Sequence, residues 1–391
     1  MKSKVFKLIE DNYDLMVEIR RDLHMNPELS FTEVRTPKKI ADFHKELGLE
    51  VRTGVGGRGV VSTLKGGKPG KTVALRADFD ALPIQDEKET EYKSKVDGVM
   101  HACGHDAHTA ALLGLAKALA SVKDEIAGNI VFIHQHAEEV IPGGAIAMIE
   151  DGCLENVDVI FGTHVRSTVP YGKIAYRSGA TMAAPDKFRI KVIGKGGHGA
   201  YPHETVDALV AGTQIVNSLQ TIVSRRINPL ESAVVTVGSF HAGNAFNVIA
   251  DTAVIEGTVR TFDESVRTKI EEEIGRVANG VCASAGGSCE YTYTRGYPSL
   301  WNHPEETQMV VEAAKAVAAP EDIIEINPIM GGEDFAYYLQ HVPGAFFYSC
   351  AGNEEKGAKY PHHHPKFDID ERAMLVGAKT MASVTLDYLN K

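Results

Sequence analysis

Four side chains that can bind a transition metal lie close together in the stretch MHACGHDAHTA, at residues 100–110: His101, Cys103, His105 and His108. Thiolate and imidazole are ligands that zinc and its neighbours in the transition series prefer. The same residue types can also form a cysteine nucleophile with a histidine base. A third interpretation assigns all four to the core or to a loop. Cys103 and His105 form the strongest pair, because residues two apart in an extended turn point the same way.

Two adjacent carboxylates, Glu138 and Glu139, come shortly after the apolar stretch GNIVFIHQ at 128–135. Adjacent side chains in extended backbone project to opposite sides, so one carboxylate can bind a metal while the other faces a substrate. This geometry predicts one ligand and one general base. A solvated acidic pair is the alternative, and the position after an apolar strand argues against it.

Other candidate groups follow further apolar stretches. His164 comes after VDVIFGT, and Asp78 and Asp80 lie in ALRADFDALP. Three consecutive histidines occur near the end of the chain, in YPHHHPKFDID: His362, His363 and His364. Metal-binding residue types at several separate strand ends are the pattern expected of a site that the fold assembles.

The elements that would position these groups alternate between strands and helices. Residues 71–77, 128–135 and 157–165 are short and apolar, and 108–122 has a helical pattern. This alternation predicts an α/β layer with a mainly parallel sheet, whose strands end at one common edge. The α/β pattern resumes near the end of the chain, with a helical segment, a loop and the apolar strand GAFFYSCAG.

The middle of the chain follows a different pattern, in the order β-α-β-β-α-β that is typical of a ferredoxin-like unit. Its first helix is expected to bury one stripe, formed by Val206, Leu209, Val210, Thr213, Val216 and Val223. Its second helix is expected to bury another, formed by Val266, Ile270, Ile274, Val277 and Val281. We therefore predict a catalytic domain at 1–182 and 297–391, split by an inserted lid or dimerisation domain at 183–296.

Length, charge and cysteine content narrow the class of protein. A chain of 391 residues favours two lobes over one. The net charge of −11 argues against a nucleic acid or an anionic membrane as partner. Five scattered cysteines do not resemble a disulfide framework. There is no signal-peptide pattern and no apolar stretch long enough to span a membrane, so a cytoplasmic location is expected.

Nine ordered motifs between residues 20 and 372 resemble the amidohydrolase branch of the dinuclear-metal aminoacylase and carboxypeptidase superfamily. This branch includes hippurate hydrolases, N-acyl-amino-acid amidohydrolases, auxin-conjugate hydrolases and N-acetyldiaminopimelate deacetylases. The motifs are RRDLHMNPELSF, RADFDALP, MHACGHDAHTA, the EE pair, GKGGHGAYPHETVDA, GNAFNVIAD, GTVRTF, GGEDFAYY and HHPKFDIDE.

The resemblance implies two divalent ions, with zinc, manganese, cobalt and nickel as candidates. Cys103 would bridge them, with His105 and His164 on one ion and Glu139 and His363 on the other. His363 is preferred because the last ligand of the family usually stands two residues before a proline, here Pro365, and His362 is the alternative. Glu138 would be the general base, and Asp80 would orient a ligand imidazole. For His101 and His108 we expect packing or supporting roles.

The resemblance also assigns roles to the inserted domain. His198 would stabilise the oxyanion of the tetrahedral intermediate. Asn247 and Arg260 could contact a substrate carboxylate, although a purely structural role is an even alternative for Arg260. Many members of the family form a dimer through this domain, so a homodimer is expected.

The implied activity is hydrolysis of the amide bond of N-acyl-L-amino acids by metal-activated water. A dipeptidase, a carboxypeptidase or an N-acetyldiaminopimelate deacetylase on the same scaffold is the alternative. A cysteine hydrolase would survive chelation and be inactivated by alkylation. A binding protein without activity is a further hypothesis, and the presence of Glu138 beside a complete ligand set argues against it.

Overall fold

The computed structural model describes residues 1–391 and divides into two compact units. The first unit contains Met1–Thr181, Trp301–Asn327 and Asp334–Lys391. The second contains Met182–Leu300 and Pro328–Glu333. The insertion predicted at 183–296 falls inside the second unit. That unit also takes in the short segment Pro328–Glu333, which the sequence had placed in the last catalytic segment.

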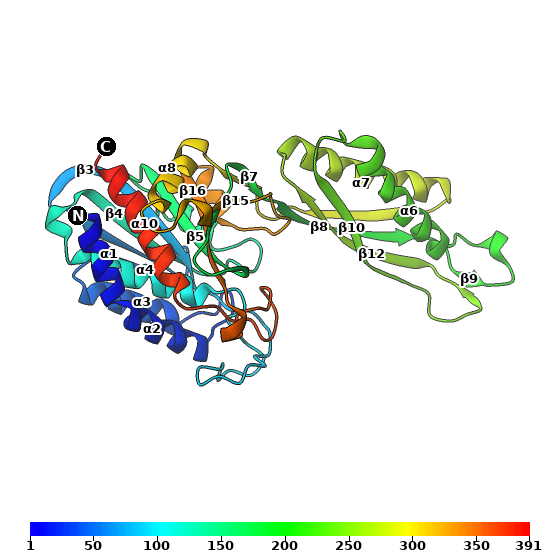
Figure 1. The fold of residues 1–391 in the computed structure, drawn as a ribbon. Helices are drawn as coiled ribbons and strands as arrows, with labels where there is room; N and C mark the ends of the chain where they lie inside the picture. The colour runs from blue at the N-terminus through cyan, green and yellow to red at the C-terminus, as the bar shows by residue number, and fades with distance from the viewer. The chain divides into compact units, whose positions relative to one another are not determined.

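The first unit is built on an eight-stranded sheet with the order β1-β2-β4-β3-β5-β16-β6-β15 (Figure 1). Its centre is parallel: β4 (Ala127–Gln135), β3 (Lys68–Asp78), β5 (Val159–Pro170) and β16 (Gly344–Gly352). The flanking strands are β1 (Glu50–Val55), β2 (Gly59–Lys65), β6 (Ile174–Tyr176) and β15 (Ile323–Glu325). The predicted α/β class with a mainly parallel central sheet is confirmed.

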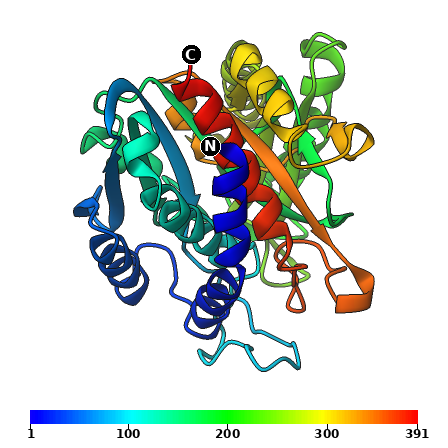
Figure 2. The same cartoon turned by 60° about the vertical axis from the view of Figure 1, so that its left-hand side comes forward.

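Helices cover both faces of this sheet, which is why its central strands are continuously apolar. On one face Ser349 of β16 donates a hydrogen bond to the carbonyl of Ala373, at the start of α10 (Ala373–Leu389). On the other face the ring of Phe346 packs against that of Phe335 in α9 (Phe335–Leu339), with 4.9 Å between the ring centroids. Figure 2 shows α1 (Lys2–Asp11) beside α10, where Lys2 pairs with Asp387.

The remaining elements of the first unit complete the two layers. They are α2 (Tyr13–Met25), α3 (Arg35–Glu46), α4 (His105–Ala120), α5 (Ala145–Glu150) and α8 (Pro304–Ala314). Two short strands, β7 (Gly179–Met182) and β14 (Leu300–Asn302), lie where the chain passes between the units. None of the helices combines the length and the apolar character that a membrane crossing requires.

The second unit is a four-stranded antiparallel sheet in the order β10-β12-β8-β13, with two helices. Along the chain the elements are β8 (Ala184–Ile193), α6 (Ala208–Arg226), β10 (Ala233–Ala242), β12 (Thr252–Thr261), α7 (Glu264–Ser284) and β13 (Ser288–Thr294). Both helices begin at an aspartate whose side chain accepts backbone N–H groups, Asp207 for α6 and Asp263 for α7. The predicted ferredoxin-like order is confirmed. A two-stranded ribbon, β9 (Gly197–His198) and β11 (Val248–Ile249), extends from this sheet.

The buried face predicted for the first lobe helix is wrong. Helix α6 buries Ala211, Ile215, Leu219 and Ile222 against the sheet, whereas Leu209 and Val210 are 44% and 49% exposed. The helix carries apolar residues on two stripes, and only contact with the sheet decides which one is buried. Helix α7 has one apolar stripe and buries it as predicted, from Val266 through Ile274 to Val277.

Candidate metal centre

The thiol of Cys103 lies at the centre of the candidate site. Its sulfur belongs to two groups of donor atoms, and the atoms within each group lie within 4.8 Å of one another. One group contains Cys103, His105 and Glu139, and the other contains Cys103, His164 and His362. A sulfur shared by two donor sets has the placement required of a bridging ligand.

The backbone around Cys103 turns sharply at Gly104. This glycine has φ of 96° and stands immediately before α4, so Cys103 lies in the turn and His105 is the first residue of the helix. A Cβ atom at Gly104 would lie 2.2 Å from Cγ2 of Val165. Glycine is therefore the residue that lets the cysteine and the first helical histidine face the same point.

Two histidines direct one ring nitrogen at the cluster and have the other ring nitrogen fixed by a hydrogen bond. Nδ1 of His105 donates to Oδ1 of Asp80 at 3.1 Å, and its Nε2 is buried with no hydrogen-bond partner. Nδ1 of His164 donates to the carbonyl of Val165 at 2.6 Å, and its Nε2 lies 3.4 Å from Sγ of Cys103. Fixing one ring nitrogen as a donor leaves the other as a metal ligand, which is the arrangement that metal sites use.

The other two histidines of the MHACGHDAHTA stretch are placed differently. His108 uses both ring nitrogens, since Nδ1 donates to Asp78 at 2.6 Å and Nε2 accepts the N–H of Val165 at 2.9 Å. This engagement leaves no lone pair for a metal. His101 is buried, and burial lowers its pKa to about 4, so the ring is neutral.

Two of the three late histidines, His362 and His363, reach the cluster. Nδ1 of His362 lies 3.7 Å from Sγ of Cys103, while Nε2 of His363 lies 3.2 Å from Oε1 of Glu139. His363 has φ of 64°, in the left-handed region that non-glycine residues seldom adopt, and its N–H donates to the carbonyl of Ala102. Strained backbone of this kind concentrates at functional sites. The contact with Glu139 agrees with the ligand pair inferred from the resemblance, and the choice of His363 over His362 stays a prediction.

The loop that carries the two glutamates is anchored at two points. The N–H of Glu139 donates to Oδ2 of Asp80 at 3.0 Å, so one carboxylate orients both this loop and His105. The N–H of Ala137, whose φ is 53°, donates to Oε1 of Glu33 at 3.0 Å. Glu33 is a functional candidate that the sequence did not indicate. Neither its residue type nor its position in a polar loop indicates this role, because the role depends on a contact with a residue 104 positions away.

A buried ion network holds two further parts of the site together. The fully buried guanidinium of Arg20 donates to Asp106 at 3.0 Å and to Asp368 at 2.7 Å. Asp106 lies next to His105 in α4, and Asp368 lies in the segment that follows the late histidines. Arg20 stands in a motif that carried the family resemblance, but no spacing rule pointed to these partners.

The cluster contains an excess of buried negative charge. Burial, followed by the charges of Glu139 and Glu138, raises the pKa of the Cys103 thiol well above its usual value. Burial alone would lower the pKa of His105, but Asp78 and Asp80 raise it to about 10. Both shifts show that this site favours added positive charge. Together with the thiolate and imidazole donors and the unpartnered Nε2 of His105, they fit a site for divalent cations.

The predicted lobe residues lie at two separate places in the second unit. His198 pairs with Val248 in the β9–β11 ribbon, and the adjacent N–H of Gly199 donates to the carbonyl of Asn247, so His198 and Asn247 are neighbours. Arg260 pairs with Pro185 near the far end of β12, about 26 Å of extended strand from Thr252. Its guanidinium donates to the carbonyls of Met330 and Val259.

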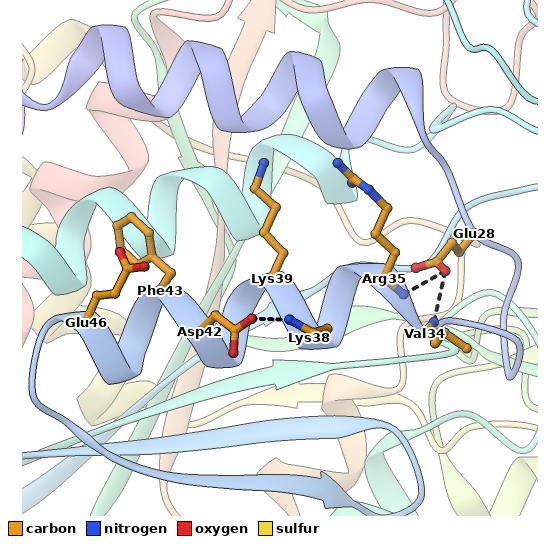
Figure 3. A pocket seen from close by; sticks show the side chains of 8 residues that line it. All are labelled: Glu28, Val34, Arg35, Lys38, Lys39, Asp42, Phe43 and Glu46. Carbon is orange, nitrogen blue, oxygen red and sulfur yellow. Dashed lines mark hydrogen bonds and ion pairs between the residues drawn. The ribbon is translucent and has the colours of Figure 1, made fainter.

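A pocket of about 660 Å³ beside α3 has a different character (Figure 3). It is lined by Glu28, Val34, Arg35, Lys38, Lys39, Asp42, Phe43 and Glu46. Lys38 pairs with Asp42, and Glu28 accepts the N–H groups of Val34 and Arg35 at the start of the helix. Arg35 and Lys39 pair with Asp22, which does not line the pocket, and none of the lining residues belongs to a metal-ligand cluster.

Comparison with known proteins identifies the family. The model of peptidase family M20/M25/M40 matches residues 74–387, and the chain belongs to this family. YhaA of Bacillus subtilis, which is named an amidohydrolase, is 57% identical over 388 residues, covering 99% of this chain and 98% of its own. The N-acyl-L-amino acid amidohydrolase of Geobacillus stearothermophilus is 46% identical over 309 residues, covering 78% and 82%.

A solved structure agrees with this assignment. The crystal structure of the YXEP protein of Bacillus subtilis, a dinuclear metal-binding peptidase from the M20 family, superposes with a TM-score of 0.83 and 36% identity. The match covers 97% of this chain and 99% of that one. The chain is therefore an amidohydrolase, a peptidase-related enzyme that acts on amides.

The turn at Gly104 provides a test of the site geometry. Gly104→Ala should destabilise the protein by about 1–3 kcal/mol, because alanine is strained at this φ and its Cβ would overlap Val165. Urea unfolding measures the change. Gly280→Ala is the matched control, since Gly280 is an exposed residue of α7 with open space around its Cα, and alanine there should be neutral or stabilising by up to about 1 kcal/mol. Equal stability changes in the two variants would contradict the argument.

Proposed function

We propose that this enzyme hydrolyses the amide bond of N-acyl-L-amino acids with the help of two divalent cations. Cys103, His105, Glu139, His164 and His363 would hold the cations. The observation that carries this proposal is the position of the Cys103 sulfur in two donor groups at once. The dinuclear centre of the YXEP protein and the activity named for the Geobacillus relative support it.

When bound, the two cations would polarise the amide carbonyl and lower the pKa of a water molecule. Zinc, manganese, cobalt and nickel are the candidate ions, because the donor set mixes a soft thiolate with imidazole and carboxylate. The same thiolate should make the site sensitive to oxidation. All five cysteines are free thiols, which supports a reducing, cytoplasmic location as a prediction.

Glu138 is the proposed general base. It is buried, stands next to Glu139, and a carboxylate oxygen lies within 4.8 Å of the buried carboxylate of Asp334. Glu138 would take a proton from the attacking water and return it to the departing amine nitrogen. Asp80 would hold the ring of His105 and the N–H of Glu139 in position throughout, because it accepts a hydrogen bond from each.

His198 is the proposed donor to the oxyanion. Its Nδ1 accepts the N–H of Ala200 at 3.1 Å, so the proton of the neutral ring resides on Nε2 and is available to donate. Asn247, its neighbour in the same ribbon, would contact the substrate. Arg260 keeps a substrate-binding role as a prediction, although its guanidinium is already engaged with two backbone carbonyls.

A substrate panel tests the proposed function. The protein is stripped with a chelator, reloaded separately with zinc, manganese, cobalt or nickel, and assayed with N-acetyl, N-benzoyl and longer N-acyl amino acids. N-Acetyldiaminopimelate, N-acetyl-L-cysteine and dipeptides complete the panel. Turnover of N-acyl amino acids that chelation abolishes and metal restores is the expected result. Preferred cleavage of dipeptides would instead identify a peptidase, and activity that survives chelation but not alkylation would identify a cysteine hydrolase.

Two variants separate the base from the ligands. Glu138→Gln should retain both cations while kcat falls by about 100-fold or more, because the amide cannot accept the proton from water. Cys103→Ala should lose bound metal as well as activity. Elemental analysis after gel filtration measures occupancy beside the rate. Wild-type turnover in Glu138→Gln would refute the assignment of the base, and full occupancy in Cys103→Ala would refute the bridging role.

We further propose that the second unit forms a homodimer. The apolar stripe of α6 that does not face the sheet is exposed, and Leu209 lines a groove of about 640 Å³ together with Phe246 and Val248. An exposed apolar surface of this kind is typical of an interface. Leu209→Asp with Phe246→Asp should convert a dimer into a monomer in sedimentation analysis. A wild-type protein that sediments as a single chain at micromolar concentration would contradict the proposal.

A further inference from the structure

One cation near the candidate metal centre lacks a polar partner within the protein. Arg166 lies in β5, two residues after His164, and positions two apart in a strand face the same side of the sheet. The separation along the strand is about 6.6 Å. The Arg166 side chain therefore emerges beside His164, on the same face and further toward the carboxyl end of the strand.

The guanidinium of Arg166 makes a cation–π contact with an aromatic ring. Its Cζ lies 5.7 Å from the ring centroid of Tyr348, and its Nη1 is buried with no hydrogen-bond partner. Tyr348 is directly opposite His164 in the β5–β16 pairing. A buried charged donor without an acceptor costs free energy, which a bound anion would recover.

Two fully buried arginines of the first unit have carboxylate partners. Arg20 contacts Asp106 and Asp368, and Arg76 contacts Asp78 and Asp334. Arg166 has a second cation near it instead, because both Arg166 and Lys173 oppose the rise that burial causes in the pKa of the Cys350 thiol. Lys173 is paired with Asp322 at 3.2 Å. The surroundings of Arg166 are thus suited to an anion.

We propose that Arg166 binds the α-carboxylate of the N-acyl amino acid, as a specificity-determining residue. This inference rests on the proposed function, since that carboxylate is two bonds from the amide nitrogen that leaves. The planar guanidinium can bind a carboxylate through two parallel hydrogen bonds, and its cation–π contact with Tyr348 restricts where the guanidinium lies. Arg260, the arginine that the family resemblance suggested for this task, donates to backbone carbonyls instead.

Kinetics with paired substrates test the proposal. Wild type and Arg166→Met, both reloaded with metal, are assayed with N-acetyl-L-methionine and with N-acetyl-L-methioninamide, which has no carboxylate. For the acid, KM should rise in the variant on the order of 10–100-fold with kcat nearly unchanged. For the amide, both constants should stay within about 2-fold. Arg166→Lys should fall between wild type and Arg166→Met, because it keeps the charge but not the two parallel donors.

Lys173→Met is the matched control. It removes the neighbouring cation, which already has a carboxylate partner, and should change KM for the acid by less than about 3-fold. An equal loss for the acid and the amide in Arg166→Met would overturn the proposal. A loss confined to N-succinyl-L-methioninamide, whose carboxylate lies in the acyl group, would also overturn the assignment to the α-carboxylate.

Binding measurements separate this inference from the proposed function. Calorimetry with metal-loaded wild type compares N-acetyl-L-methionine with its amide under conditions without turnover. One outcome is that wild type hydrolyses no N-acyl amino acid and still binds the acid more tightly than the amide. If Arg166→Met removes that preference, the result supports the carboxylate site at Arg166 and contradicts the proposed activity. If wild type shows no preference for the acid, the proposal for Arg166 is wrong even if the activity is confirmed.

Discussion

The carboxylate of Asp80 holds three segments of the chain in one arrangement. It accepts hydrogen bonds from Nδ1 of His105 in α4, from the N–H of Glu139 after β4, and from the hydroxyl of Ser30 before α3. These segments are far apart in sequence, and Asp80 meets Glu139 because they follow β3 and β4, which are parallel neighbours. Since Asp80 is fully buried, each contact is formed away from competing water, and losing one would leave a charged acceptor unpaired. The geometry of the candidate ligands depends on this carboxylate.

Charge is balanced around the cluster but not within it. Arg20 and Arg76 each neutralise buried carboxylates and so fix the ends of α4, β3 and the segment before α10. At the centre, the Cys103 thiol lies among the charges of Glu139 and Glu138, and Arg166, two residues after His164, has a buried Nη1 with no acceptor. The paired buried charges around the cluster make its surroundings rigid. The atoms inside that have no hydrogen-bond partner are where metal ions and substrate would bind.

The two units follow different physical rules for burial. The central strands of the first unit are covered on both faces and are largely buried, so their carboxyl ends are the natural place for polar groups. The second unit is one sheet with helices on a single side, and β8 alternates between buried and exposed residues. Helix α6 has more apolar surface than that sheet can cover. The remainder, around Leu209, is free for contact with another chain.

The sequence by itself determined the α/β class, the ferredoxin-like insertion, the buried face of α7 and the family, because periodicity and ordered motifs are properties of contiguous residues. It also selected Cys103, His105, Glu139 and His164, whose donor atoms the fold brings together. Only the tertiary structure decided which stripe of α6 is buried, that Glu33 supports Ala137, that both His362 and His363 reach the cluster, and that Arg166 has no acceptor. Each of these depends on contacts between residues far apart in sequence, and a side chain's partner across such a distance is set by packing rather than by its neighbours along the chain.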